Sequence, residues 1–96
     1  MLEELFQIIE DRKANPVEGS YTNRLLEAGE DEILKKVGEE AIEVILAAKA
    51  QGNQRLIEEI ADLCYHCLVL LAARDLAMAD VQEELDRRHS QKGVKP

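Results

Sequence analysis

Apolar residues recur at helical spacing along most of the chain. Near its start, Leu2, Leu5, Phe6 and Ile9 repeat every three or four positions, which predicts an amphipathic helix over residues 2–13. The proline at position 16 ends this helix, because a proline keeps the residue before it out of the α-helical region. The same criterion predicts three long helices further on, over about 30–50, 54–74 and 78–88.

A shorter helix is predicted between the first two of these segments. Ser20 can cap its N-terminus through the side-chain hydroxyl, and Gly29 suits the position just after its C-terminus. The connections are short, and the sequence contains neither a linker nor an internal repeat. It therefore predicts an all-α, four-to-five-helix bundle forming one domain over residues 1–89, followed by a flexible tail over residues 90–96.

Composition supports helices and argues against strands. The chain has 96 residues, enough for one domain, and only 3% of them are aromatic. The 46% hydrophobic share is dominated by Leu, Ile and Ala, which favour helices more than sheets. A domain this small is marginally stable alone, and its most apolar helix, 54–74, has more apolar surface than the chain can cover. We therefore expect a tight homodimer.

The charge balance excludes several partners. A formal net charge of −8 disfavours binding to nucleic acid. The longest apolar run, residues 60–73, is too short to span a membrane, and acidic residues stand at the N-terminus where a signal peptide needs basic ones. We expect a cytoplasmic protein with no membrane partner. An anionic substrate would need a divalent cation to offset the negative charge.

Carboxylates form a stripe on each of two neighbouring helices. Glu39, Glu40 and Glu43 lie between apolar arcs of the helix 30–50, and Glu59 and Asp62 share one side of the helix 54–74. The short connection predicts antiparallel packing, so that the two stripes face each other.

Such a cluster persists only if its carboxylates are protonated or are neutralised by cations. Oxygen ligands favour hard ions, so we expect Mg²⁺, with Mn²⁺ as a substitute. The predicted metal ligands are Glu40, Glu43, Glu59 and Asp62. The alternative for the first stripe is a solvated helix face that pairs with Lys35 and Lys36.

Three other positions have both a chemical and a structural interpretation. His66 is either a metal ligand or base, or a partly buried histidine hydrogen-bonded to Asp62. Cys64 and Cys67 stand in mid-helix, away from the helix N-terminus that a redox pair requires, and are interpreted as buried thiols. Gly38 in mid-helix is interpreted as a site of close helix packing rather than of phosphate approach.

The spacing Glu39-Glu40-x-x-Glu43 followed by Glu59-x-x-Asp62 resembles the signature of the all-α, MazG-like nucleoside-triphosphate pyrophosphohydrolases. The flanking sequence is more specific and is similar to the phosphoribosyl-ATP pyrophosphohydrolase family. The segments that carry this similarity are residues 12–16, 19–22, 35–41 and 61–66, and the likeness extends from Leu2 to His89.

The resemblance implies hydrolysis of phosphoribosyl-ATP to phosphoribosyl-AMP and pyrophosphate, the second step of histidine biosynthesis, by a helical dimer. With the chain ending at Pro96, the cyclohydrolase that acts next is expected to be a separate protein. Glu39 and Glu40 are the predicted catalytic residues, Glu39 either as a ligand or as the base that orients water. Contacts to substrate phosphates are predicted for Lys36, Lys35, Arg12, Lys13, Ser20, Tyr21 and Thr22.

Two other functions are compatible with the acidic pattern. One is a general house-cleaning pyrophosphohydrolase for nucleoside triphosphates. The other is a non-enzymatic helical adaptor whose carboxylates bind metal structurally.

Overall fold

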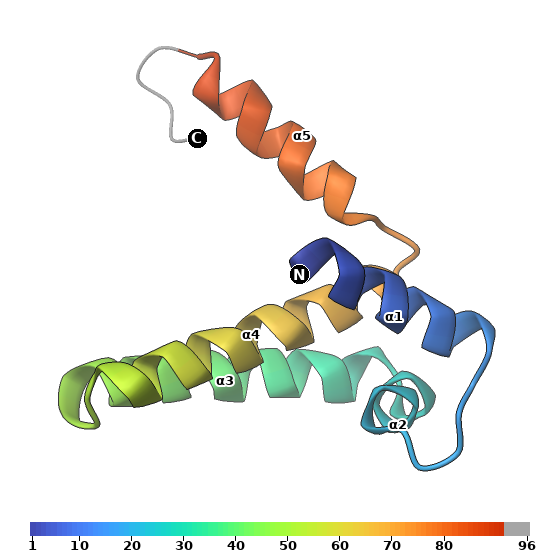
Figure 1. The fold of residues 1–96 in the computed structure, drawn as a ribbon, viewed down its shortest axis with the longest axis horizontal. Coiled ribbons are helices and arrows are strands. Elements are labelled where there is room, and N and C mark those ends of the chain that lie inside the picture. Colours follow the sequence, from blue (N-terminus) through green and yellow to red (C-terminus); the bar gives the residue numbers. More distant parts are fainter. Residues whose placement is uncertain (92–96) are drawn as a thin grey trace.

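The computed structural model describes residues 1–91 and shows an all-α chain (Figure 1). Its five helices are α1 (Leu2–Ala14), α2 (Tyr21–Ala28), α3 (Glu30–Ala50), α4 (Asn53–Ala73) and α5 (Met78–His89). No strand occurs within the described residues. The all-α prediction is confirmed, and every predicted helix is present with its ends within about two residues of those expected.

Helices α3 and α4 form an antiparallel hairpin, which is the largest contact between elements of the fold (Figure 1). The turn between them contains Gly52, whose φ of 87° and ψ of 168° are essentially restricted to glycine. At the other end of the hairpin, Arg74 lies 3.1 Å from Glu30 and joins the end of α4 to the start of α3. The hairpin places the two carboxylate stripes on facing helices.

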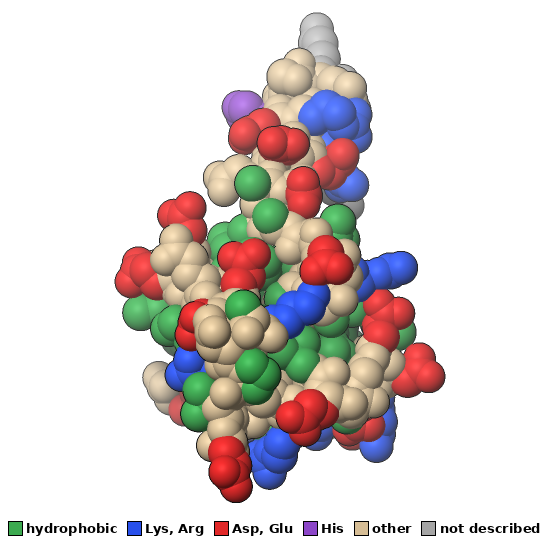
Figure 2. Space-filling view, turned by 90° about the vertical axis from the view of Figure 1, so that its right-hand side faces the viewer, with side chains coloured by type: hydrophobic (Ala, Val, Ile, Leu, Met, Phe, Trp, Pro, Cys, Tyr) green, Lys and Arg blue, Asp and Glu red, His purple; other side chains and the backbone are tan. Residues whose placement is uncertain are grey.

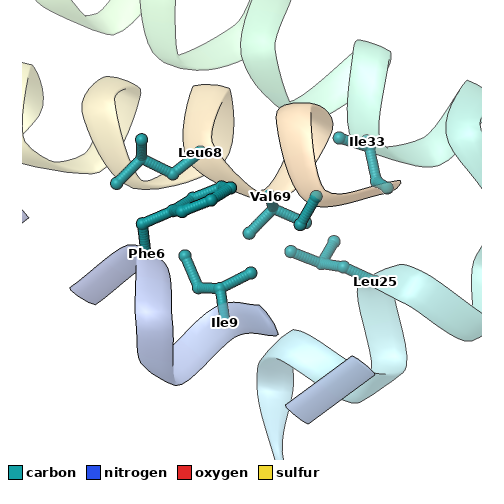
Figure 3. Close-up of a cluster of buried hydrophobic side chains, with 7 residues drawn as sticks. Phe6, Ile9, Leu25, Ile33, Leu68 and Val69 are labelled. Carbon is teal, nitrogen blue, oxygen red and sulfur yellow. The ribbon is translucent and has the colours of Figure 1, made fainter. Parts of the chain in front are cut away.

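Helices α1 and α2 pack against the end of the hairpin that lies away from its turn. The buried core is there, and Figure 3 shows apolar side chains from four helices pointing toward one another. Its most completely buried members are Ile9 from α1, Ile33 from α3 and Val69 from α4, each with 0% exposure. Burial of such side chains stabilises the fold by about 1.5–3 kcal/mol each. This core fixes where α2 lies relative to α4.

The segment before α2 is held by local hydrogen bonds. The hydroxyl of Ser20 accepts from the backbone N–H of Asn23 at 3.3 Å, which confirms the predicted cap. The buried side chain of Asn23 accepts from the backbone N–H of Val17 at 2.9 Å and donates to the carbonyl of Arg12 at 2.7 Å. One asparagine thereby ties the loop 15–20 to both helices that flank it.

Helix α5 projects away from the other four, and none of its residues is buried (Figure 1). Of the predicted tail, Ser90 and Gln91 follow the last turn of α5, and residues 92–96 lie outside the described part of the chain. The boundary at residue 89 and the flexibility of the tail stay predictions. None of the five described helices combines the length and apolar character needed to cross a membrane.

Two structural interpretations of the sequence are wrong for the single chain. Cys67 is exposed, because it lines an open apolar groove of about 280 Å³ between α4 and α5; Cys64 is half-buried there. Gly38 is exposed as well, and a Cβ atom built on it would meet nothing within 4 Å. Helical periodicity placed both positions beside apolar neighbours, but it does not tell whether another helix of the same chain covers them.

Charged side chains are spread over the surface. On the face shown in Figure 2, acidic and basic residues are intermixed, and the basic ones do not gather into one patch.

Candidate active site

Three carboxylates from the two hairpin helices converge at one place. Glu40 on α3 and Glu59 and Asp62 on α4 each offer an oxygen atom that lies within 4.8 Å of those of the other two. The i, i+3 spacing of Glu59 and Asp62 puts both on the same side of α4, and the hairpin brings that side against Glu40. The facing of the two predicted stripes is therefore observed for these three residues.

The three carboxylates differ in their exposure to water. Glu59 is buried at 5% exposure, Glu40 is half-buried, and Asp62 is exposed. Partial burial and the neighbouring negative charge of Asp62 raise the pKa of Glu40, and Glu59 adds to that effect. The cluster therefore lies at an open edge of the hairpin, where it can be reached from solvent.

A basic residue that we had not predicted contacts this cluster. Arg55 on α4 bridges two carboxylates, with Nη2 2.5 Å from Oε1 of Glu59 and Nη1 2.5 Å from Oε1 of Glu58. The i, i+3 and i, i+4 spacing of these residues is the signal that could have identified the pairs from sequence.

The remaining predicted acidic residues lie on α3 outside this group of three. Glu39 is exposed, and its carboxylate lies 3.9 Å from Nζ of Lys36, an i, i+3 pair of the kind expected for a solvated face. Glu43 is half-buried and is not among the carboxylates that approach one another within 4.8 Å. Lys35 is exposed one position before Lys36. The assigned roles of these four residues stay predictions.

A buried histidine lies one turn beyond Asp62 on α4. Nδ1 of His66 lies 2.7 Å from the backbone carbonyl oxygen of Asp62, and Nε2 lies 3.1 Å from the hydroxyl oxygen of Tyr21. A carbonyl oxygen only accepts, so Nδ1 donates to it, and Nε2 forms its hydrogen bond with the hydroxyl of Tyr21. His66 therefore has two hydrogen-bond partners within the chain, and its bond to residue 62 is to the backbone rather than to the carboxylate.

The start of α2 is attached to α4 by a second pair of hydroxyls. The side chain of Thr22, which is buried, hydrogen-bonds the hydroxyl of Tyr65. The rings of Tyr21 and Tyr65 stack with centroids 6.2 Å apart, and Arg24 lies over the Tyr21 ring at 5.5 Å. The hydroxyls of residues 20–22, predicted to contact phosphates, are thus engaged in capping α2 and in joining it to α4 beside the carboxylates.

Two predicted phosphate contacts from α1 have partners elsewhere. Nζ of Lys13 lies 2.8 Å from the carbonyl oxygen of Ala72 and 2.5 Å from Oδ1 of Asp75, at the C-terminal end of α4. Arg12 is half-buried and lies 3.5 Å from Asp11. These contacts give Lys13 a capping role, since the last carbonyls of a helix have no partner within it.

The donor set of the cluster fits a hard divalent cation. All three converging groups are carboxylates, and oxygen-only ligands suit magnesium or manganese and not zinc. Burial, and then the negative charge of Asp62, raise the pKa of Glu40, so this carboxylate favours either a proton or a nearby cation.

Comparison with known proteins identifies the family. The sequence model of phosphoribosyl-ATP pyrophosphohydrolase matches residues 2–89. The chain belongs to this family. It is 57% identical to the phosphoribosyl-ATP pyrophosphatase of Listeria welshimeri over 92% of its length and 84% of that relative's, and 53% identical to that of Clostridium acetobutylicum over 93% and 81%. The resemblance noted in the sequence is thereby confirmed.

A longer, bifunctional relative contains a region similar to this chain. The chain is 49% identical to the histidine biosynthesis bifunctional protein HisIE of Caldanaerobacter subterraneus, over 93% of its own length and 43% of the relative's. In that relative, the matching region is under half of the protein.

Proposed function

We propose that this chain hydrolyses phosphoribosyl-ATP to phosphoribosyl-AMP and pyrophosphate, the second step of histidine biosynthesis. Membership of the family over residues 2–89 carries the proposal, and the carboxylate cluster between α3 and α4 supplies chemistry suited to a phosphoanhydride. The enzyme is accordingly a hydrolase that acts on a small-molecule nucleotide. The cyclohydrolase that would act next on the product stays a predicted partner in the pathway.

The cluster would hold Mg²⁺, with Mn²⁺ as a substitute, through Glu40, Glu59 and Asp62, and Glu43 is the predicted fourth ligand. When bound, such an ion lowers the pKa of water and offsets negative charge on phosphate oxygens. The exposure of Asp62 leaves that side of the cluster open to a substrate.

Protein residues around the cluster would bind and orient the substrate. Glu39 is exposed on α3, next in sequence to Glu40, and can accept a proton from an attacking water. Glu40, the other predicted catalytic residue, would act through the metal ion that it holds. Lys36 is half-buried on α3, and its ammonium lies near the carboxylate of Glu39, where it can bind phosphate oxygens. Lys35, the preceding residue, supplies a second positive charge on the same helix.

We also propose that the active form is a homodimer. Large apolar side chains remain exposed on the half of the hairpin near its turn, on both α3 and α4: Ile42, Ile45, Leu46, Ile57 and Ile60. An apolar area shared by two packed helices is typical of an interface between subunits. Sedimentation over a range of concentrations tests this proposal, and a monomer at all concentrations would contradict it.

The decisive experiment measures pyrophosphate release from phosphoribosyl-ATP with and without magnesium, beside a panel of ordinary and modified nucleoside triphosphates. Magnesium-dependent turnover of phosphoribosyl-ATP alone supports the proposal. Turnover of other triphosphates alone would assign the chain to nucleotide clearance, and no turnover of any of them would favour the helical adaptor.

The site assignment is tested separately by replacing a carboxylate with its amide. Asp62→Asn should lower magnesium-dependent turnover by roughly 100-fold or more, because loss of even an outer-shell partner typically costs about 10- to 100-fold. Glu43→Gln should do the same if Glu43 is a ligand. Glu3→Gln, which alters an exposed carboxylate in the first turn of α1, is the matched control. Unchanged activity and magnesium dependence in Asp62→Asn would refute the site.

A further inference from the structure

The ion pair between Arg55 and Glu59 sets a basic group against the buried member of the carboxylate cluster. Glu59 is buried, whereas the side chain of Arg55 is 48% exposed and reaches Glu59 from the solvent edge of α4. Within residues 1–91, no other ion pair joins a cation to Glu40, Glu59 or Asp62. Arg55 is therefore the counter-ion that makes a buried Glu59 tolerable in the metal-free chain.

The same guanidinium is bound to a second carboxylate outside the cluster. Its Nη1 lies 2.5 Å from Glu58, which is partly exposed and also accepts from Nε2 of Gln54 at 3.2 Å. Arg55 can leave Glu59 and still have a negatively charged partner.

We propose that Arg55 is a built-in counter-ion that holds Glu59 in the metal-free protein and competes with a divalent cation for it, with Glu58 as its alternative partner. This inference rests on the proposed function, because it requires that the cluster bind a metal ion. A positive charge fixed on a ligand carboxylate opposes a second cation by direct repulsion and by occupying Oε1. Arg55 would thus tune metal affinity and protect the metal-free fold.

The alternative role for Arg55 is to orient Glu59 for the metal, and the two roles predict opposite changes in metal affinity. If Arg55 only orients Glu59 for the metal, its removal will weaken metal binding. If Arg55 competes, its removal will strengthen metal binding while destabilising the metal-free protein. The sign of the change in affinity separates the two roles.

The test is Mn²⁺ binding to the full chain without substrate, followed by the electron paramagnetic resonance signal of free Mn²⁺. Arg55→Met should bind Mn²⁺ about three- to tenfold more tightly than the wild type, as expected for removing one nearby charge at a partly exposed site. In EDTA its thermal midpoint should fall, and added Mn²⁺ should raise that midpoint by more than in the wild type. Unchanged or weaker Mn²⁺ binding by Arg55→Met overturns the proposal.

Three further variants control this measurement. Lys49→Met removes an exposed positive charge from α3 and reports the effect of net charge alone. Arg55→Lys keeps the charge but cannot bridge two carboxylates, so its affinity should lie between those of the wild type and Arg55→Met; it also serves if Arg55→Met fails to fold. Glu58→Gln should weaken Mn²⁺ binding, and this effect should shrink in the Arg55→Met background, because Glu58 would act partly through Arg55.

Wild type and Asp62→Asn distinguish failure of this inference from failure of the proposed function. If the wild type binds no Mn²⁺, the metal site and the inference fall together. The other case is that the wild type binds Mn²⁺ and Asp62→Asn does not, which supports the metal site. If Arg55→Met then binds Mn²⁺ no more tightly than Lys49→Met, only the proposed role of Arg55 is wrong.

Discussion

His66 and Tyr21, 45 positions apart in sequence, are joined by a hydrogen bond between Nε2 and the tyrosine hydroxyl at 3.1 Å. The other ring nitrogen, Nδ1, donates to the backbone carbonyl of Asp62, so both ring nitrogens have partners and the orientation of the ring is fixed. The bond attaches the N-terminus of α2 to α4 one turn from the carboxylate cluster. It therefore controls where residues 20–22 lie relative to the site.

Tyr21→Phe should destabilise the fold, because it leaves the buried Nε2 of His66 without a hydrogen-bond partner. The expected loss is about 1–3 kcal/mol in the free energy of unfolding, measured by denaturant titration at a fixed protein concentration. The retained ring keeps its stacking on Tyr65, so the change isolates the hydroxyl. A ¹⁵N spectrum of the wild type should show a proton on Nδ1 of His66. A variant as stable as the wild type would mean that the bond does not form in solution.

Glu40→Gln should abolish metal-dependent activity and yet stabilise the metal-free protein near neutral pH. Since burial and Asp62 raise the pKa of Glu40 above its value in the unfolded chain, its contribution to stability is present below the unfolded pKa. That contribution is lost as the pH rises through the folded pKa, where the carboxylate becomes charged. An amide of the same shape avoids this loss.

Calorimetry in EDTA and in magnesium across pH 4–8 tests this prediction. In EDTA, Glu40→Gln should unfold at a higher midpoint than the wild type at pH 7, and the difference should diminish toward pH 4. Magnesium should raise the midpoint of the wild type but not that of the variant, and the effect on the wild type should weaken in acid as protons compete for Glu40. A variant less stable than the wild type in EDTA at pH 7 would contradict the pKa argument.

Lys13→Met should lower stability more than it lowers the affinity for substrate. The lysine ammonium binds the carbonyl of Ala72 and the carboxylate of Asp75, which has a left-handed φ of 57° just after α4. Loss of the cap should cost about 1–2 kcal/mol. Thermal denaturation and steady-state kinetics together decide the role, with Lys35→Met as the comparison. A raised KM with an unchanged melting midpoint would instead place Lys13 at the substrate phosphates.

Gly38→Ala should stabilise α3 by about 1 kcal/mol, because glycine in mid-helix is unfavourable and nothing lies within 4 Å of the added Cβ. The midpoint should rise by about 4–8 °C in a domain of this size. If activity falls while stability rises, the glycine keeps space for the substrate beside Glu39. If stability falls, the partner subunit packs against Gly38 in the dimer.

The predictable part of the site came from residues on a single helix. Glu59 and Asp62 share a side of α4 through their spacing, and the short turn at Gly52 required the stripe on α3 to face them. The i, i+4 spacing of Arg55 and Glu59 also allows their pairing to be predicted from sequence. Nothing in the sequence, however, distinguishes Arg55 from the other basic residues of the chain. Spacing alone gives the direction of a side chain around its helix and not the partner it meets.

The roles of residues 12–22 depended on packing between elements distant in sequence. Sequence alone offered these hydroxyls and cations as phosphate contacts. In the fold, Thr22 and Tyr21 reach Tyr65 and His66, and Lys13 reaches the end of α4. Those contacts span 43 to 59 positions in sequence, so no local pattern encodes them.

The sequence by itself determined the helices, their ends and the family, because helical periodicity, capping residues and motif strings are local features of the chain. Tertiary structure decided that Glu40 meets Glu59 and Asp62 most closely, and that Cys67 and Gly38 are uncovered within one chain. The physical reason is that burial and charge pairing depend on which helix faces lie together in space. That arrangement is set by the shared core of α1, α2, α3 and α4 and not by any one segment.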